Sequence, residues 1–132
     1  MKSKFKRYAA LLIEDDKGNM LMGKRTDSGK WANPGGKIED GEDPFTGAIR
    51  ECIEETGLEP KKIELINAKF KKDRKVLVYG FKVAVDLKQK PDPSQDPDKE
   101  FKELIYIDPS KVVDELHIPI EDNVLLEYYM EN

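Results

Sequence analysis

The sequence predicts an α/β domain in which a mixed β-sheet is flanked by helices, and three observations support this prediction. The chain of 132 residues fits one domain, residues 1–132, and is long enough to bury a hydrophobic core. Strand-like and helix-like segments follow one another in the order ββ-α-ββ-β-α-α. A single cysteine and a single histidine exclude a disulfide framework and a zinc site built from several cysteines.

The first third of the chain predicts two strands and a glycine-rich loop. Residues 7–14 and 20–25 are strand-like runs on either side of the turn at 16–19, Asp-Lys-Gly-Asn, which predicts a β-hairpin. Residues 28–41 contain the run Trp-Ala-Asn-Pro-Gly-Gly and predict a loop.

The next segment, residues 44–56, predicts a helix with recognisable ends. Asp43 is suited to cap its N-terminus, Pro44 to occupy its first position, and Gly57 to follow its C-terminus. Five apolar side chains recur at helical spacing and predict one stripe that faces the core: Phe45, Ala48, Ile49, Cys52 and Ile53.

The rest of the chain predicts, in order, two strands, a loop, a strand and two helices: residues 63–70, 75–85, 86–99, 103–107, 109–116 and 120–129. A basic turn, residues 71–74, separates the first two of these strands. Three prolines mark the loop, because proline interrupts regular structure. Apolar residues at helical spacing make the final helix amphipathic.

The charge balance limits the function classes. The chain has 27 acidic and 23 basic residues, a net charge of −4, which disfavours general nucleic-acid binding but permits a local site for small anions. No apolar run approaches the roughly 18 residues of a membrane span, and the N-terminal apolar stretch is too short for a signal peptide. Together with the absence of disulfides, this leads us to expect a cytoplasmic protein.

The predicted helix at 44–56 carries an unusual concentration of acid. Glu51, Glu54 and Glu55 share one face, and residues 39–59 contain eight acidic residues against the single base Arg50. A divalent cation would balance this charge, and carboxylate ligands favour Mg²⁺ or Mn²⁺. The alternative is a solvated acidic surface that binds no ion.

The wider spacing supports the metal-binding interpretation. Gly36 is followed by five residues, Glu42, seven residues, and then residues 50–58, Arg-Glu-Cys-Ile-Glu-Glu-Thr-Gly-Leu. This pattern resembles the Nudix hydrolase signature, G-x5-E-x7-R-E-U-x-E-E-x-G-U with U bulky and apolar, and all seven fixed letters match. Cys52 stands where the family usually has a larger aliphatic residue, from which we expect a packing difference without a chemical role.

The resemblance extends over roughly residues 7–110 and implies both a fold and a reaction. The implied fold is an α/β/α sandwich with a mixed, partly antiparallel β-sheet. The implied reaction is attack of water on a phosphorus atom of a pyrophosphate that links a nucleoside to another moiety. Mg²⁺ or Mn²⁺ would serve as the cofactor. Because homodimers are frequent in the family, both a monomer and a homodimer stay open.

The same resemblance implies roles for individual residues. Glu51, Glu54 and Glu55 would ligate the metal, with the carbonyl of Gly35 as a further ligand. Glu51 is our first choice for the general base. The remaining signature positions would orient or support these groups: Arg50, Glu42, Gly36 and Gly57. Glu103, and with less support Glu100, would add a ligand or the base.

Substrate contacts are less constrained by the sequence. Lys24 and Arg25 are candidates to bind phosphates, and Trp31 is a candidate to stack on a base. The glycine at 36 would let the backbone approach the substrate. A structural role for these side chains is the alternative in each case. A basic cluster at Lys69, Lys71, Lys72, Arg74 and Lys75 is either a site for polyphosphate or an RNA 5′ end, or a solvated hairpin. We expect His117 to be a surface residue.

Several functional hypotheses therefore stay open. The leading one is a pyrophosphohydrolase that acts on (d)NTPs, modified nucleotides or nucleotide sugars such as ADP-ribose. The alternatives are an RNA 5′-end pyrophosphohydrolase and a catalytically silent nucleotide sensor. A silent module would be expected to lose one of the signature glutamates, and the signature here is intact.

Overall fold

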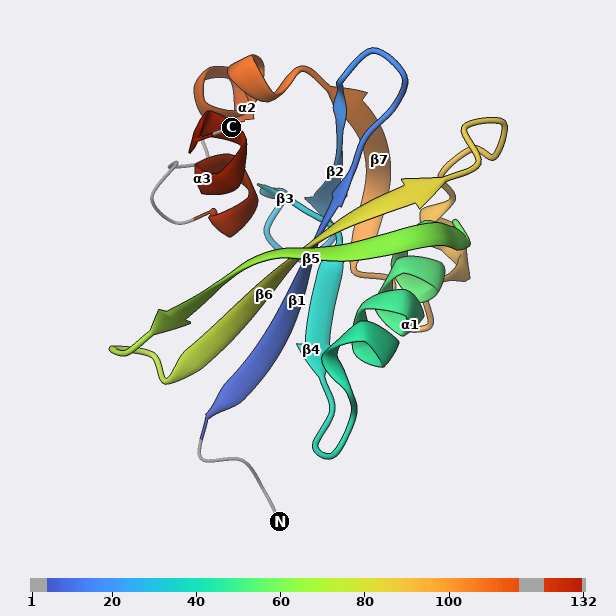
Figure 1. Ribbon diagram of the computed structural model, residues 1–132. Helices are drawn as coiled ribbons and strands as arrows, with labels where there is room; N and C mark the ends of the chain where they lie inside the picture. Colours follow the sequence, from blue (N-terminus) through green and yellow to red (C-terminus); the bar gives the residue numbers. More distant parts are fainter. Residues whose placement is uncertain (1–4, 117–122, 132) are drawn as a thin grey trace.

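The computed structural model describes residues 5–116 and 123–131 (Figure 1). Its strands are β1 (Lys6–Ile13), β2 (Met20–Arg25), β3 (Trp31–Ala32), β4 (Gly35–Ile38), β5 (Pro60–Lys71), β6 (Val76–Val85) and β7 (Phe101–Ile107). Its helices are α1 (Pro44–Thr56), α2 (Pro109–Leu116) and α3 (Val124–Glu131), with a short 3₁₀ helix, η1 (Pro93–Gln95). These elements confirm the predicted bounds of the central helix and the order of the elements after it. The prediction of a loop over residues 28–41 is wrong in part, because Trp31–Ala32 pairs with β2 and Gly35–Ile38 pairs with β1, which adds two short strands before α1. Ile120, where the last helix was expected to begin, and His117 lie outside the described residues.

The strands form two sheets, in the orders β4-β1-β6-β5 and β3-β2-β7. β1 runs parallel to β6, and the other strand pairs are antiparallel, so the predicted mixed sheet is confirmed. The predicted hairpin is wrong. Its turn forms, because the Asp15 carboxylate accepts hydrogen bonds from Lys17 N and Asn19 N. However, both edges of β1 are occupied by β4 and β6, and only an isolated bridge joins Glu14 to Met20.

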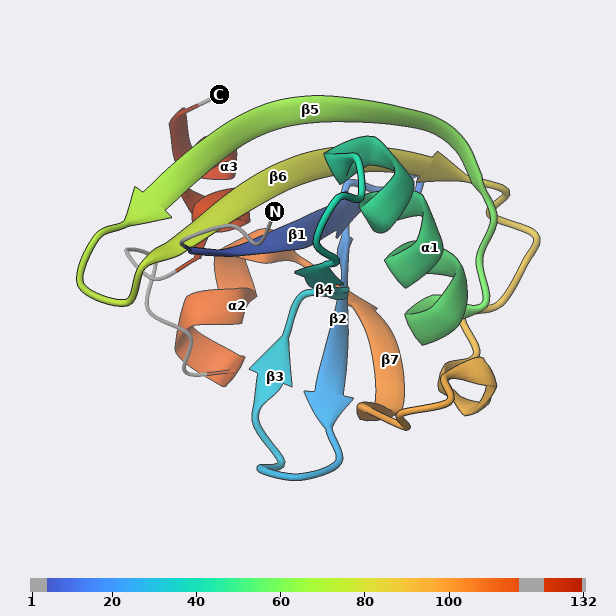
Figure 2. The same ribbon diagram turned by 90° about the horizontal axis from the view of Figure 1, so that it is seen from below.

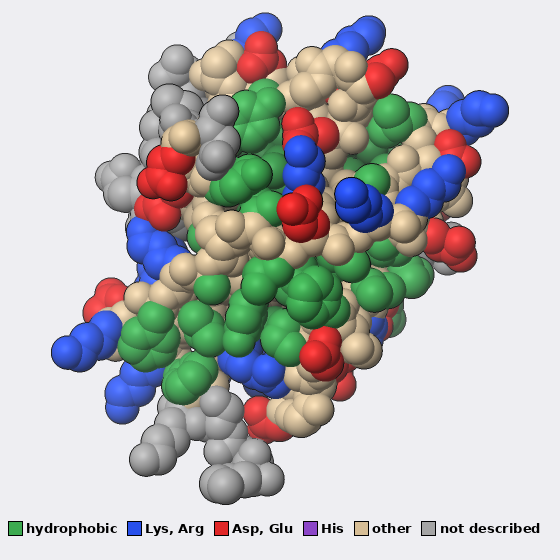
Figure 3. All heavy atoms as spheres, viewed as in Figure 1, with side chains coloured by type: hydrophobic (Ala, Val, Ile, Leu, Met, Phe, Trp, Pro, Cys, Tyr) green, Lys and Arg blue, Asp and Glu red, His purple; other side chains and the backbone are tan. Residues whose placement is uncertain are grey.

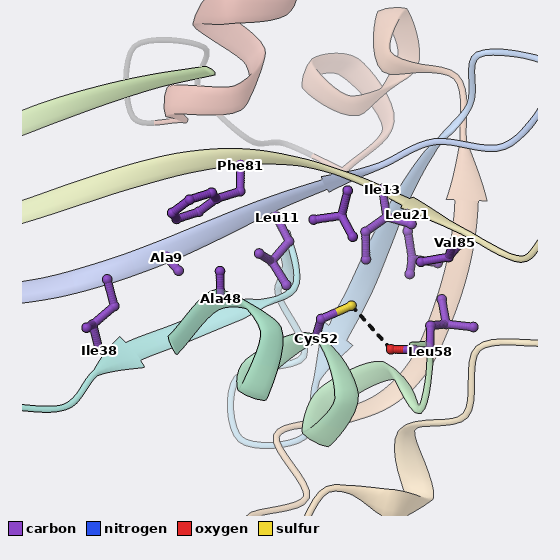
Figure 4. Close-up of a cluster of buried hydrophobic side chains, with 11 residues drawn as sticks. Ala9, Leu11, Ile13, Leu21, Ile38, Ala48, Cys52, Leu58, Phe81 and Val85 are labelled. Atoms are coloured by element: carbon purple, nitrogen blue, oxygen red, sulfur yellow. Dashed lines mark hydrogen bonds between the residues drawn. The ribbon is translucent and has the colours of Figure 1, made fainter. Parts of the chain in front are cut away.

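Helices cover both faces of this arrangement, which gives the predicted α/β/α sandwich (Figure 2). Ala48 and Cys52 of α1 pack into a cluster with Leu11 and Phe81 (Figure 4). On the other side, α2 and α3 contribute to a second cluster, whose buried members are Leu12, Met20, Met22, Val112, Val124, Leu125 and Leu126. Alternate side chains of β1 therefore pack against the helices on opposite sides of the sheet, as expected for a strand covered on both faces. No helix among the described residues is long and apolar enough to cross a membrane.

Helix α1 has the predicted ends but not the predicted orientation. Asp43 accepts hydrogen bonds from Phe45 N and Thr46 N, and Gly57, at φ 70°, donates its N–H to Ile53 O. Of the predicted apolar stripe, only Ala48 and Cys52 are buried, whereas Phe45, Ile49 and Ile53 are 40%, 37% and 43% exposed. The prediction of one buried stripe is wrong because the helix is rotated. Its buried face also includes Gly47, Glu55 and Thr56, so that an acidic side chain points inward.

Candidate metal and phosphate site

The two glycines of β4 allow the helix glutamates to approach the sheet. A Cβ atom on Gly36 would lie 2.4 Å from Glu51 Oε2, and one on Gly35 would lie 2.0 Å from the carbonyl oxygen of Ala9. Gly35 has a φ of +146°, which side-chain-bearing residues rarely adopt. Its N–H donates a hydrogen bond to Glu55 Oε1. The glycine pair therefore fixes the carboxylates of Glu51 and Glu55 against the backbone of β4.

Arg50 joins the signature acids to one another. Its Nε and Nη2 donate to the two carboxylate oxygens of Glu42, at 2.9 Å each, and its Nη1 donates to Glu51 Oε1 at 2.8 Å and Glu54 Oε2 at 3.3 Å. Nη2 also donates to the carbonyl of Lys37. These contacts, led by the hydrogen bonds that Arg50 donates to Glu42, raise the pKa of Arg50, and Arg50 in turn lowers the pKa of Glu42. The orienting role that the resemblance implies for Arg50 and Glu42 fits this geometry.

Arg7, on β1, donates hydrogen bonds to the loop between β4 and α1. These hydrogen bonds were not predicted from the sequence. Arg7 Nη2 donates to the carbonyls of Glu39 and Glu42, at 2.8 and 3.0 Å. Glu42 Oε1 also accepts from Glu39 N. The loop before α1 is therefore tied both to β1 and to Arg50. Nothing local in the sequence marks Arg7, because its partners lie more than thirty residues away.

The loop before β7 brings two further acids, Asp96 and Glu100, to Glu55 of α1. Glu55, Asp96 and Glu100 each offer a carboxylate oxygen, and these oxygens lie within 4.8 Å of one another. Glu55 is 1% exposed, and its Oε2 has no hydrogen-bond partner among the described residues. Burial, and next the neighbouring carboxylate of Glu100, raise the pKa of Glu55 to about 10. Burial likewise raises the pKa of Glu51 to about 7, although Arg50 opposes the effect.

This donor set suits a hard divalent cation. Carboxylate oxygens and a backbone carbonyl are the ligands that Mg²⁺ and Mn²⁺ prefer, and a buried carboxylate oxygen without a partner is costly. A cation would satisfy Glu55 Oε2 and would favour the ionised forms of Glu51 and Glu55. Glu54, whose side chain is 35% exposed, lies at the outer side of the same face.

The structure distinguishes between the two late glutamates considered from the sequence. Glu103 is exposed on β7 opposite Lys24, whereas Glu100 lies beside Glu55. A turn at Asp96 positions Glu100, because the Asp96 carboxylate accepts from Asp98 N and Glu100 N. Asp96 was not among the site residues predicted from the sequence. An Asp-Pro-Asp turn was the available signal, but it does not show that the loop folds back onto α1.

Three of the candidate substrate residues, Lys24, Arg25 and Trp31, lie on the second sheet, whereas Gly36 lies on β4 of the first. Arg25 makes two hydrogen bonds to the exposed carboxylate of Asp27, which raise the pKa of Arg25, and the charges of Glu100 and Glu55 also act on it. Lys24 pairs with Trp31 in the register of β2 and β3. Trp31 lines a pocket of about 270 Å³ that also includes Asn33, Asn123 and Ala10.

Two amides meet in this pocket, which we call the Trp31 pocket. Asn123 Nδ2 donates to Asn33 Oδ1 at 2.7 Å, while Asn33 Nδ2 has no partner among the described residues. Neither amide was singled out as a site residue from the sequence. Cys52, by contrast, is buried, and this burial raises its pKa to about 11, so the thiol is unreactive, as expected.

Comparisons with known proteins place the site in a family context. The model of the NUDIX domain matches residues 4–128. An RNA pyrophosphohydrolase of Dinoroseobacter shibae is 39% identical over 64 residues, which cover 47% of this chain and 40% of that protein. A MutT-like protein of Streptomyces ambofaciens is 42% identical over 57 residues, 43% of this chain and 36% of that protein. The match thus spans less than half the length of these relatives.

Solved structures show the same fold at low identity. MutT from Aliivibrio salmonicida and Vibrio cholerae, described together, superposes with a TM-score of 0.77 at 19% identity, covering 98% of this chain and 100% of that one. A MutT protein from Methanosarcina mazei has a TM-score of 0.72 at 23% identity, with 99% and 94% coverage. An Ap4A hydrolase from C. elegans has a TM-score of 0.72 at 18% identity and covers 96% of each chain.

Proposed function

The chain belongs to the Nudix family, and we propose that it is a divalent-metal-dependent pyrophosphohydrolase. It would cleave the pyrophosphate linkage of a nucleoside diphosphate joined to another moiety, by attack of water on phosphorus. The observation that carries the proposal is the buried carboxylate of Glu55, which has an unpartnered oxygen and is surrounded by further acids beside the Gly35–Gly36 backbone. A purely structural acidic helix would not bury such a group.

The proposed metal ligands are Glu51, Glu54, Glu55 and the carbonyl of Gly35, with Glu100 as a further donor. When bound, Mg²⁺ or Mn²⁺ neutralises phosphoryl oxygens and makes water more acidic. Arg50 holds Glu51 and Glu54 in fixed positions by charge-assisted hydrogen bonds. Glu42 and Gly36 support this arrangement, the first by holding Arg50 and the second by leaving space for Glu51.

Glu51 remains our proposed general base. Its carboxylate is held between Arg50 and Gly36, and in the metal-free protein its pKa is about 7, which suits proton transfer at neutral pH. For the late glutamate we favour Glu100 over Glu103, because Glu100 lies with Glu55 while Glu103 is exposed on β7.

For the substrate we propose a nucleotide. The Trp31 pocket would hold the base, since a tryptophan ring and two amides supply a stacking surface and hydrogen-bonding groups. Arg25 and Lys24 would bind phosphate oxygens. A relative supports a second candidate, the 5′ end of RNA, because the Dinoroseobacter protein is named an RNA pyrophosphohydrolase.

A substrate panel tests the proposal. Phosphate or pyrophosphate release is measured from dNTPs, 8-oxo-dGTP, ADP-ribose, Ap4A and triphosphate RNA, each with Mg²⁺, Mn²⁺ or EDTA, using a coupled phosphatase where the product requires it. We expect metal-dependent turnover of at least one substrate, and its loss in Glu54→Gln. Glu59→Gln, an exposed acid outside the cluster, is the matched control and should keep full activity. Binding of nucleotide without any turnover would instead indicate a silent sensor.

A further inference from the structure

A cationic pocket of about 500 Å³ lies at the N-terminal end of β1, and none of the acids of the proposed metal site lines it. Five cations and one acid line it: Lys6, Arg7, Lys37, Arg74, Lys75 and Asp40. The chain as a whole carries a net charge of −4, whereas the side chains that line this pocket carry a net positive charge. Lys and Arg side chains around the tip of β5 and β6 are visible at the lower left of Figure 3.

The cations come from three separate parts of the sheet, so a basic hairpin tip alone does not explain them. Lys6 lies on β1, Lys37 on β4, and Arg74 and Lys75 in the turn between β5 and β6. A hydrogen bond from Lys6 N to Lys75 O joins the first strand to the turn. Lys75 adopts a φ of 51°, which few side-chain-bearing residues do, and it thereby completes the turn.

These side chains are available to a ligand. Lys6, Lys37, Arg74 and Lys75 are exposed, and no acid within residues 5–116 and 123–131 forms an ion pair with any of them. Arg7 points instead to the carbonyls of the loop before α1. Four cations held close together repel one another, and a polyanion would relieve that repulsion.

The cationic pocket and the proposed catalytic site both include residues of β4. Lys37 is two residues beyond Gly35 on β4, a distance of roughly 7 Å along a strand. On the neighbouring strand, Tyr8 pairs with Lys37 while Ala10 pairs with Gly35. Tyr8 lines the cationic pocket and Ala10 lines the Trp31 pocket, so both pockets lie along the same face of β1.

We propose that the cationic pocket binds the phosphodiester backbone of a single-stranded RNA whose 5′-polyphosphate occupies the catalytic site. This inference rests on the proposed function. In the proposed function a mononucleotide occupies the catalytic site and the Trp31 pocket, which leaves the cationic pocket for phosphates further along a chain. A polynucleotide with a 5′-polyphosphate is an RNA that has kept the triphosphate of its first nucleotide. A basic groove beside aromatic rings, here including Tyr8, is the usual means of holding a single strand.

The test compares RNA with a mononucleotide in a charge-removing variant. The variant Lys6→Gln/Arg74→Gln changes two exposed side chains, and Lys88→Gln/Lys90→Gln, in the loop after β6, is the control with the same change of net charge. The substrates are a five-nucleotide 5′-triphosphate RNA and GTP. For the pocket variant we expect kcat/KM for RNA to fall by roughly 10- to 30-fold at 0.1 M salt, with kcat/KM for GTP unchanged. The slope of log kcat/KM against log salt should fall by about 1.4, or 0.7 for each lost phosphate contact.

A binding measurement separates failure of this inference from failure of the proposed function. Fluorescence anisotropy of the labelled RNA in EDTA reports binding without catalysis, and here too the pocket variant should bind more weakly than the control. If GTP is hydrolysed but the pocket variant and the control treat RNA alike, the inference is wrong and the proposed function stands. If RNA binds through the pocket but no substrate is hydrolysed, the proposed function fails. An equal loss for GTP and RNA would also overturn the inference, because it would indicate a structural effect.

Discussion

Replacing Glu55 with glutamine should stabilise the metal-free protein while abolishing its activity. Glu55 is 1% exposed, and burial raises its pKa from 4.5 to about 10. The folded protein therefore holds a proton on Glu55 at pH 8, whereas the unfolded chain releases it. Because the folded-state pKa is raised, stability is lost as pH rises from about 4.5 towards 10.

The size of the effect follows from the same values. Between pH 4.5 and pH 8, the raised pKa of Glu55 lowers the free energy of unfolding by about 1.4 kcal/mol per pH unit. The total loss at pH 8 is at most about 5 kcal/mol. Glutamine carries no charge and can keep the hydrogen bond from Gly35 N. We expect Glu55→Gln to raise the free energy of unfolding at pH 8 in EDTA by about 2–5 kcal/mol, or Tm by at least about 6 °C. Near pH 5 the difference should nearly vanish.

Thermal and urea unfolding at pH 5 and pH 8, in EDTA and in Mg²⁺, measure this effect. Glu54→Gln is the control, because Glu54 is 35% exposed in its side chain and its replacement should change stability by less than about 1 kcal/mol. Mg²⁺ should raise the Tm of the wild-type protein but not that of Glu55→Gln. If Glu55→Gln melts at or below the wild-type temperature at pH 8 in EDTA, the argument from burial and charge is refuted.

Three further predictions follow from the same site. Mg²⁺ should bind more tightly as pH rises from 6 to 8, since the pKa of about 7 at Glu51 makes ion and proton compete; calorimetry that shows no pH dependence would contradict this. Gly36→Ala should lower kcat by roughly 100-fold with the fold retained by circular dichroism, because the new methyl group displaces Glu51; normal turnover would show that this position tolerates a side chain. Glu100→Gln should lower kcat/KM by roughly 10- to 100-fold in steady-state assays, whereas Glu103→Gln should not; the reverse order would restore Glu103 as the late acid.

Features with local causes were predicted well from the sequence. Helix α1 begins and ends where Asp43, Pro44 and Gly57 indicate, because capping depends on residues within one turn of the helix end. The spacing of the glutamates on α1 likewise predicts that Glu51 and Glu55 share a face, and both contact β4.

Features that depend on distant partners were not predicted. Periodicity identifies an apolar stripe but not the rotation of the helix, so the exposure of Ile49 and Ile53 was missed. The hairpin prediction failed because β4 and β6 occupy both edges of β1. The approach of Asp96 and Glu100 to α1 was also not predicted. It depends on how a proline-containing loop folds back, which no local pattern specifies.

The most direct test of metal-dependent pyrophosphate cleavage is hydrolysis in ¹⁸O-labelled water, followed by mass spectrometry of the products from the best substrate of the panel. We predict that one phosphorylated product carries a single ¹⁸O atom in the presence of Mg²⁺, and that neither labelled product nor turnover is found in EDTA or with Glu54→Gln. Labelled product formed equally in EDTA, or no product from any substrate that binds, would contradict the account.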